Sequence, residues 1–313
     1  MKFGSLFSGI GGFDLGFERA GMGCFWQCEI DPKARQVLKR HWDVPIYEDV
    51  KRITRQNTEA VDLICGGFPC QDVSIAGNRA GLAGKRSGLW FEFARIIELL
   101  GPKWVVVENV PGLLSSNRGR DFAVIIQWLA KCGYGVSWRI LDAQYFGVPQ
   151  RRRRVFIVGS LGTGDSATVL FESESLYGNI AQGEPAGQEI TEVLAGGAHP
   201  GGINGRDDKN WNFVIATGQG GAEIENDKSP TLSNDHEAPI IVNKRGEKSG
   251  GGRGGLESIG VRRLSPVECA RLQGFPDDWN DWLADSVRYR QYGNAVCVPV
   301  AEWIGKRIVE IAK

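Results

Sequence analysis

The sequence predicts an α/β fold: a doubly wound, mostly parallel sheet with a second, smaller domain inserted before the C-terminus. First, strand and helix patterns alternate through residues 1–160. Second, the runs VDLIC (61–65) and KWVVVEN (103–109) are nearly continuously apolar, as in strands buried on both faces of a parallel sheet. Third, residues 161–260 break the alternation and hold 20 of the 43 glycines. In such a sheet, ligands bind at the carboxyl ends of the strands.

The first two strand–helix units are well marked. Residues 2–7 (KFGSLF) form an expected strand, which is followed by the glycine-rich turn SGIGG and a helix. A second strand, GCFWQCE, ends at Glu29. Asp31 then offers an N-cap and Pro32 a first helical position, so a helix should run from there to about residue 41.

Later elements follow the same rules. In order, we expect a strand at 61–65, a helix at 89–100, a strand at 103–109, a helix at about 120–132, strands near 136–142 and 154–160, a helix opened by the capping box of Ser265 and Glu268 and ended by Gly274, and a helix at 298–312. The chain therefore divides into residues 1–160, the irregular segment 161–260, and a return to the first domain over 261–313.

Composition sets limits on function. The chain of 313 residues has 37 Lys+Arg and 37 Asp+Glu, so a nucleic-acid partner would need a locally basic surface. No apolar stretch approaches a membrane span and the N-terminus does not resemble a secretory signal, so we expect a cytoplasmic protein without a membrane partner. The seven cysteines show no zinc-ligand spacing, and we expect neither a structural metal nor disulfides.

Glycines at the first strand-to-helix turn indicate a ligand site. Gly9 and Gly11 let the backbone approach a ligand at a helix N-terminus, although an ordinary tight turn would also explain them. Glu29, at the end of the second strand, is placed to accept hydrogen bonds from ribose hydroxyls. Ile30 could lie flat on an adenine ring and Asp49 could bond its amino group. Together they predict a cofactor that contains adenosine.

Two residues at the same sheet edge predict covalent chemistry. Cys70 lies in the constrained loop GGFPCQDVS (66–74), directly after a buried strand, where a thiolate could be exposed and positioned. Glu108 ends the strand WVVVEN, and burial there would raise its pKa and make it a proton donor. An inert buried thiol and a helix-capping acid are the alternatives. A nucleophile next to an acid favours addition to a ring.

Four arginines precede the strand VFIVG. Alternate side chains of a strand share a face, so Arg152 and Arg154 can point together toward the cleft while Arg151 and Arg153 point elsewhere. A solvated basic run is the usual explanation. Here the position beside the proposed site favours contacts to a base and to phosphate.

These motifs together resemble the bacterial and phage DNA (cytosine-5)-methyltransferases, over the whole chain except most of 161–260. FSGIGG resembles the family's cofactor loop, GGFPCQDVS its catalytic loop, ENV (108–110) its acid motif and QRRRR its arginine motif. RRLSPVECARLQGFPDDW (262–279) and YGNAVCVPV (292–300) resemble the two closing motifs. Asp72 and Val73 depart from the usual small or proline residue and phenylalanine, as ordinary variation in a loop that must still close.

The resemblance implies roles for individual residues. Cys70 would be the nucleophile, Glu108 the partner of cytosine N3, and Arg154 a contact to O2, with Arg152 supporting that loop. Positions that match the S-adenosylmethionine pocket of this methyltransferase fold are Phe7, Gly9, Gly11, Glu29, Ile30, Asp49, Val50, Leu89 and Asn294. DNA-facing positions are Gln71, Ser74 and Thr231, the last from a short threonine–leucine match.

The implied reaction follows from the weak nucleophilicity of cytosine C5. A thiolate that adds at C6, with an acid at N3, generates an enamine whose C5 can take a methyl group. A base not identified by the sequence then removes the C5 proton and the thiolate leaves. By the same resemblance, 161–260 is the target-recognition domain, duplex DNA is the partner, and the protein is a monomer. A cognate restriction endonuclease would be a functional and not a physical partner.

Three other functions compete with this interpretation. The related tRNA cytosine-5 methyltransferases use the same chemistry but lack a long glycine-rich insertion. A catalytically dead DNA-binding regulator on the same fold would not need Cys70, Glu108 and Arg154 together. A nicotinamide oxidoreductase would fit the sheet but leave the PCQ and ENV motifs unexplained.

Overall fold

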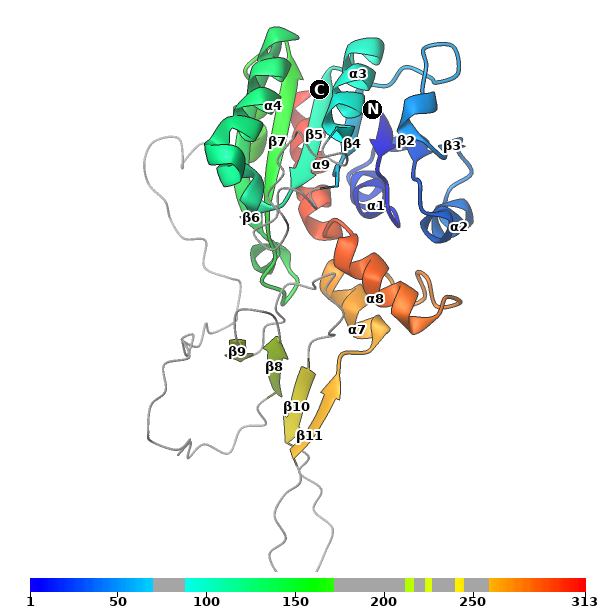
Figure 1. Ribbon diagram of the computed structural model, residues 1–313, viewed down its shortest axis with the longest axis vertical. Coiled ribbons are helices and arrows are strands. Elements are labelled where there is room, and N and C mark those ends of the chain that lie inside the picture. The colour runs from blue at the N-terminus through cyan, green and yellow to red at the C-terminus, as the bar shows by residue number, and fades with distance from the viewer. Residues whose placement is uncertain (70–87, 172–211, 217–222, 227–239, 245–258) are drawn as a thin grey trace, which may run out of the picture.

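The computed structural model describes residues 1–69, 88–171, 212–216, 223–226, 240–244 and 259–313 (Figure 1). A seven-stranded sheet in the order β3-β2-β1-β4-β5-β7-β6 forms the larger body. Its strands are β1 (Lys2–Leu6), β2 (Gly23–Cys28), β3 (Ile46–Tyr47), β4 (Leu63–Gly66), β5 (Trp104–Asn109), β6 (Tyr134–Asp142) and β7 (Arg153–Leu161). Only β7 runs against its neighbours β5 and β6, so the predicted mostly parallel sheet is confirmed.

Helices cover both faces of this sheet, as the doubly wound prediction requires. They are α1 (Gly12–Arg19), α2 (Pro32–His41), α3 (Leu89–Leu100), α4 (Arg120–Lys131), α5 (Ser166–Leu170) and α9 (Val298–Ile311). Val105 and Val107 pack with α3 and α4, whereas Trp104 and Val106 pack with α1, α5 and α9. Successive residues of β5 therefore enter opposite cores, which is why its sequence is apolar throughout.

A third cluster closes the carboxyl edge of the sheet. It contains α7 (Pro266–Gln273), α8 (Asp285–Asn294) and the loop between them, packed against α2. The side chain of Ser265 accepts a hydrogen bond from the Glu268 backbone N–H and Glu268 bonds back to the Ser265 N–H, which confirms the capping box. We call residues 264–297 the closing segment.

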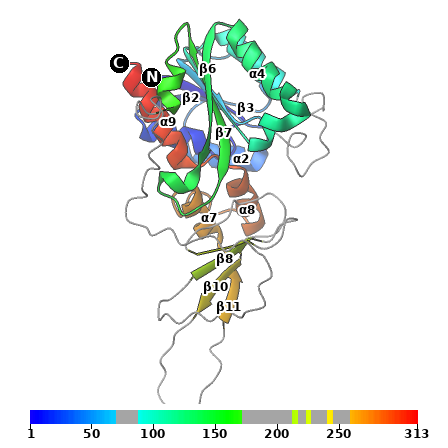
Figure 2. The same cartoon turned by 90° about the vertical axis from the view of Figure 1, so that its left-hand side faces the viewer.

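A second, four-stranded antiparallel sheet lies beyond α7 and α8 (Figure 2). Its strands are β8 (Asn212–Ala216), β9 (Glu223–Asn226), β10 (Ile240–Lys244) and β11 (Ile259–Arg263), and they lie in the order β11-β10-β8-β9. The chain thus leaves the larger body after α5 and returns to it through β11.

Several elements were not predicted, among them β3, α5 and α8. The strand β3 has two residues, and α5 has five, too few for a periodic pattern. The helix α8 lacks an apolar stripe because part of its buried side is polar: Arg288 and Gln291 both bond to the buried side chain of Asn280. No helix in the described ranges is both long and apolar enough to cross a membrane.

Candidate active site

The turn after β1 has a left-handed backbone at three positions. Phe7, Gly9 and Gly11 have φ angles of 54°, 58° and 86°, in the left-handed region that favours glycine. A Cβ on Gly11 would also lie 2.4 Å from the ring of Trp42, whereas a Cβ on Gly9 would meet nothing within 4 Å. Glycine is therefore needed at position 9 for its positive φ alone. At position 11 it is needed both for its positive φ and because a Cβ would clash with Trp42. Below, residues 7–11 are the cofactor loop.

Glu29 lies directly against this loop. One carboxylate oxygen accepts the Gly9 backbone N–H at 2.7 Å and the other accepts the Asp31 N–H at 2.8 Å. Burial raises the pKa of Glu29, and these two backbone bonds oppose that shift. Arg35 donates to the carbonyls of Glu29 (3.1 Å) and Ile30 (2.7 Å), which fixes the strand end from the side of α2. The Ile30 side chain is 74% exposed, an open apolar surface.

The remaining predicted cofactor residues surround the same sheet edge. Asp49 caps a short 3-10 turn by accepting the Lys51 N–H at 2.9 Å. Phe7, Val50 and Leu89 belong to one apolar cluster, in which Phe7 stacks on Phe93 with ring centroids 6.3 Å apart. The structure therefore brings the first, second and third strand ends together, as predicted for a doubly wound sheet.

Asn294 enters from the closing segment. It is the last residue of α8 and is exposed, and the carbonyls on either side of it, of Gly293 and Ala295, accept bonds from the Arg152 guanidinium at 3.1 and 2.9 Å. Arg152 is 3% exposed, and burial, together with the charge of Arg154, lowers its pKa to about 9. Arg152 thus supports the loop and has no free surface for the phosphate contact suggested by its sequence position.

Glu108 and Arg154 form an ion pair at the same edge. Because β7 is antiparallel to β5, the start of β7 lies beside the end of β5. Arg154 Nε lies 3.0 Å from Glu108 Oε1, and the two side chains are only 17% and 13% exposed. A carboxylate and a guanidinium are therefore held side by side with little access to water, which strengthens their interaction.

The loop that leads to Cys70 passes directly beneath this pair. A Cβ on Gly67 would lie 2.8 Å from Glu108 Oε2, and Asn109 Nδ2 donates to the Phe68 carbonyl at 3.3 Å. Cys70 follows Gly67 by three residues, a reach of at most about 11 Å. Cys70, Gln71, Ser74 and Thr231 lie outside the described residues.

Comparison with known proteins identifies the family. The model of the C-5 cytosine-specific DNA methylase family matches residues 1–310. The chain belongs to this family. It is therefore a DNA (cytosine-5) methyltransferase.

Several relatives support the assignment. The type II methyltransferase M.NgoBI of Neisseria gonorrhoeae is 34% identical over 95% of this chain and 89% of its own length. M2.BsuMI of Bacillus subtilis (strain 168) is 32% identical over 98% of this chain and 75% of its own length. The crystal structure of S. pombe Dnmt2 methyltransferase superposes with a TM-score of 0.67 at 20% identity, covering 100% of this chain and 99% of that one, and shows the shared fold.

The six described cysteines of this methyltransferase are all free and protonated near neutral pH. Burial raises the pKa of each thiol, to about 12 at Cys28 and Cys269 and to about 11 at Cys297. The full set is Cys24, Cys28, Cys65, Cys132, Cys269 and Cys297. None has the electropositive, open setting of a reactive thiolate, so Cys70 is left as the candidate nucleophile.

Several supporting residues were missed from sequence. Arg35 and Arg95 bond backbone carbonyls near Glu29 and at Val50, and Trp279 bonds the cofactor loop from the far end of the chain. These contacts join residues that are far apart in the sequence or are not spaced three or four apart as helix neighbours are, so no local sequence pattern predicts them. Gly67 could have been singled out, because paired glycines after a buried strand indicate a close approach.

Proposed function

We propose that this methyltransferase transfers a methyl group from S-adenosylmethionine to C5 of a flipped-out cytosine in a specific duplex sequence, through a covalent bond between the Cys70 sulfur and C6. The observation that supports this most strongly is the Glu108–Arg154 ion pair, which lies directly over the loop that reaches Cys70 three residues later. A target base inside a duplex cannot reach such a recessed pair, so the cytosine must leave the stack.

The pair is complementary to the edge of cytosine. N3 and O2 are adjacent acceptors on that edge. The Arg154 guanidinium can donate to O2, and the Glu108 carboxylate can pair with N3 once a proton lies between the two atoms. We assign Glu108 to hold a proton at N3 and Arg154 to donate to O2, with Arg152 holding the arginine strand against the closing segment. Both contacts withdraw electrons from the ring and so favour attack at C6.

The Cys70 thiolate then adds to C6, and the electrons of the C5–C6 double bond move toward C5. S-adenosylmethionine, when bound, supplies an electrophilic methyl group on a positively charged sulfur. C5 would take this methyl group as the sulfonium S–CH3 bond breaks and leaves the neutral thioether. A base would then remove the C5 proton, and the C5–C6 double bond would re-form as the C6–sulfur bond breaks to return the thiolate. One difficult substitution thus becomes several easier steps.

The residues at the cofactor loop fit S-adenosylmethionine. Each oxygen of Glu29 accepts one backbone N–H and keeps a second lone pair for a ribose hydroxyl. The exposed Ile30 offers an apolar face to the adenine, and Asp49 an acceptor for its amino group. Gly9, Gly11 and Asn294 would line the methionine side, while Phe7, Val50 and Leu89 form the apolar wall.

We assign DNA sequence choice to the part of residues 161–260 that follows α5, with Thr231 among the DNA contacts. We assign chemistry to the larger body, which includes α5 because Val169 and Leu170 are buried in its core. The second sheet lies beyond the closing segment, on the side of the carboxyl edge, so a duplex between the two bodies would face both. The protein would act as a cytoplasmic monomer on duplex DNA. The type II names of its relatives favour a cognate restriction endonuclease as functional partner.

Bisulfite sequencing of DNA from cells that express the chain tests this function. Wild type should protect one cytosine in a defined sequence, and Cys70→Ala should protect none while still binding S-adenosylmethionine. Replacing the part of 161–260 that follows α5 by the corresponding segment of a relative with another specificity should move methylation to the relative's site. Full activity of Cys70→Ala would overturn the mechanism, and an active chimera that keeps the original site would overturn the division of labour.

A further inference from the structure

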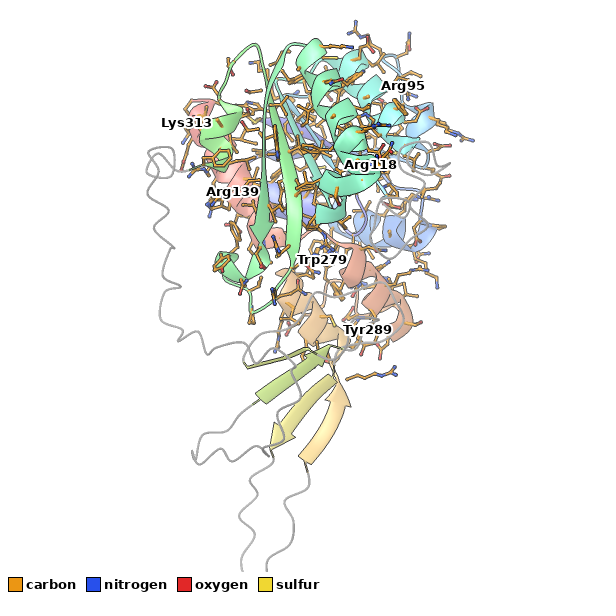
Figure 3. The ribbon with its side chains drawn as sticks, turned by 60° about the vertical axis from the view of Figure 1, so that its left-hand side comes forward. Arg95, Arg118, Arg139, Trp279, Tyr289 and Lys313 are labelled. Atoms are coloured by element: carbon orange, nitrogen blue, oxygen red, sulfur yellow. The ribbon has the colours of Figure 1, made fainter. Side chains whose placement is uncertain are left out.

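Trp279 of the closing segment contacts the cofactor loop directly. Its indole N–H donates to the backbone carbonyl of Ile10 at 2.9 Å, and both side chains are buried, at 5% and 1% exposure. Figure 3 shows Trp279 at the junction between the sheet and the helices of the closing segment. Ile10 lies between the two glycines of the loop, so this bond acts at the centre of the expected ligand site.

We propose that Trp279 is a positioning residue for the cofactor loop, and that it couples S-adenosylmethionine affinity to the segment through which the chain returns from 161–260. The inference rests on the proposed use of S-adenosylmethionine at this loop. Trp279 would act through the loop backbone, without touching the cofactor.

The indole is itself held rigidly. The imidazole of His41 stacks on it with ring centroids 3.6 Å apart and planes 5° from parallel, and His41 Nε2 donates to the Trp279 carbonyl at 2.8 Å. Trp42 and Phe275 pack against it at 5.6 and 5.3 Å. A tryptophan fixed by both its ring and its own carbonyl presents its N–H in one direction, so it can set where the Ile10 carbonyl points.

Glu29 and Trp279 therefore hold the cofactor loop from two sides, and α2 connects these two residues. Glu29 accepts the Gly9 N–H, and Trp279 donates to the carbonyl of the following residue, Ile10. Glu29 lies just before the first turn of α2, and His41 is its last residue, so α2 spans the distance between the two anchors. Displacing Trp279 would free the peptide between Gly9 and Gly11 to turn.

The closing segment, which contains Trp279, also contacts other parts of the site. It carries Asn294, whose flanking carbonyls bond Arg152, and the Gly274 carbonyl accepts a bond from Arg19 of α1 at 3.2 Å. It begins directly after β11 of the second sheet. A shift of the second sheet would therefore reach the cofactor loop through Trp279 without passing through the larger sheet.

The test uses Trp279→Phe, which keeps an aromatic ring for the stack and removes the N–H. The matched control is Trp26→Phe, because the Trp26 indole is also buried and also donates to a backbone carbonyl, that of Glu59, at 2.9 Å. Leaving a buried carbonyl unpaired should raise the dissociation constant of S-adenosylmethionine for Trp279→Phe by about five- to twentyfold. Its KM for the cofactor should rise similarly, and kcat at saturating cofactor should stay near that of wild type.

Calorimetry on the full chain separates the outcomes. Unchanged affinity in Trp279→Phe, or equal weakening in Trp26→Phe, would overturn the positioning role. If the wild-type protein does not bind S-adenosylmethionine, the proposed cofactor is wrong, and the positioning role that rests on it is wrong as well. Should Trp279→Phe not fold, hydrogen exchange of wild type decides: cofactor binding should slow exchange in residues 275–283 as well as in 7–14, and unchanged exchange in 275–283 would refute the coupling.

Discussion

Adding one methyl group at Gly67 should slow methyl transfer without weakening cofactor binding. The Cβ of Gly67→Ala would lie 2.8 Å from Glu108 Oε2, where ordinary contact begins at about 3.4 Å, so the carboxylate must retreat by roughly 0.6 Å. Glu108 cannot do this freely, because its other oxygen is paired with Arg154 at 3.0 Å. A misplacement of about 1 Å can cost on the order of a hundredfold in rate, so kcat should fall roughly tenfold to a hundredfold.

Single-turnover methylation at saturating S-adenosylmethionine measures this effect, and calorimetry should give an unchanged cofactor dissociation constant. Gly164→Ala is the control, since a Cβ there meets nothing within 4 Å. The double variant Gly67→Ala with Glu108→Asp should not lose activity additively, because the shorter acid already leaves the pair. Wild-type turnover in Gly67→Ala would show that Glu108 does not act from the position seen here.

Two further predictions concern the carboxylates near the cofactor loop. Glu29→Ala should weaken S-adenosylmethionine binding by about 1.5–3 kcal/mol, the value of a charge-assisted hydrogen bond, and an unchanged calorimetric constant would remove Glu29 from the pocket. Burial raises the pKa of Asp14 to about 6 from 3.8, so folding should lose stability as pH rises from about 4 to 6, by roughly 3 kcal/mol in total. Asp14→Asn can keep the bonds to Ser5 and Gln27, and urea unfolding should show it without that loss; equal pH slopes in both proteins would contradict the buried charge.

Local patterns were sufficient for most of the fold. The Asp31 cap, the Ser265 capping box and the alternating apolar runs each depend on residues within one turn or one strand, and the predicted bounds match those of α2, α3 and α7. The helix α8 was not predicted, because its buried Arg288 and Gln291 form hydrogen bonds with Asn280 of the preceding loop. A pattern of apolar residues cannot indicate such polar contacts.

The sequence indicated candidate residues for the site but not the contacts that they make. Strand alternation predicted that Arg152 and Arg154 point together toward the cleft. In the structure Arg152 lies just before β7 and bonds carbonyls 141 and 143 residues away, whereas Arg154 pairs with Glu108. The Trp279 bond spans 269 residues. Such contacts follow from strand order and helix packing, and these are set by the whole chain.

The most direct test of the mechanism is covalent trapping on DNA that carries 5-fluorocytosine in the target site. Fluorine at C5 cannot be removed as a proton would be, so the reaction should stop with the cytosine bonded to the enzyme. Mass spectrometry of the digested complex should find the methylated base on the peptide that contains Cys70. An adduct on any of the six buried or half-buried cysteines, or turnover with no adduct, would contradict Cys70 as the nucleophile.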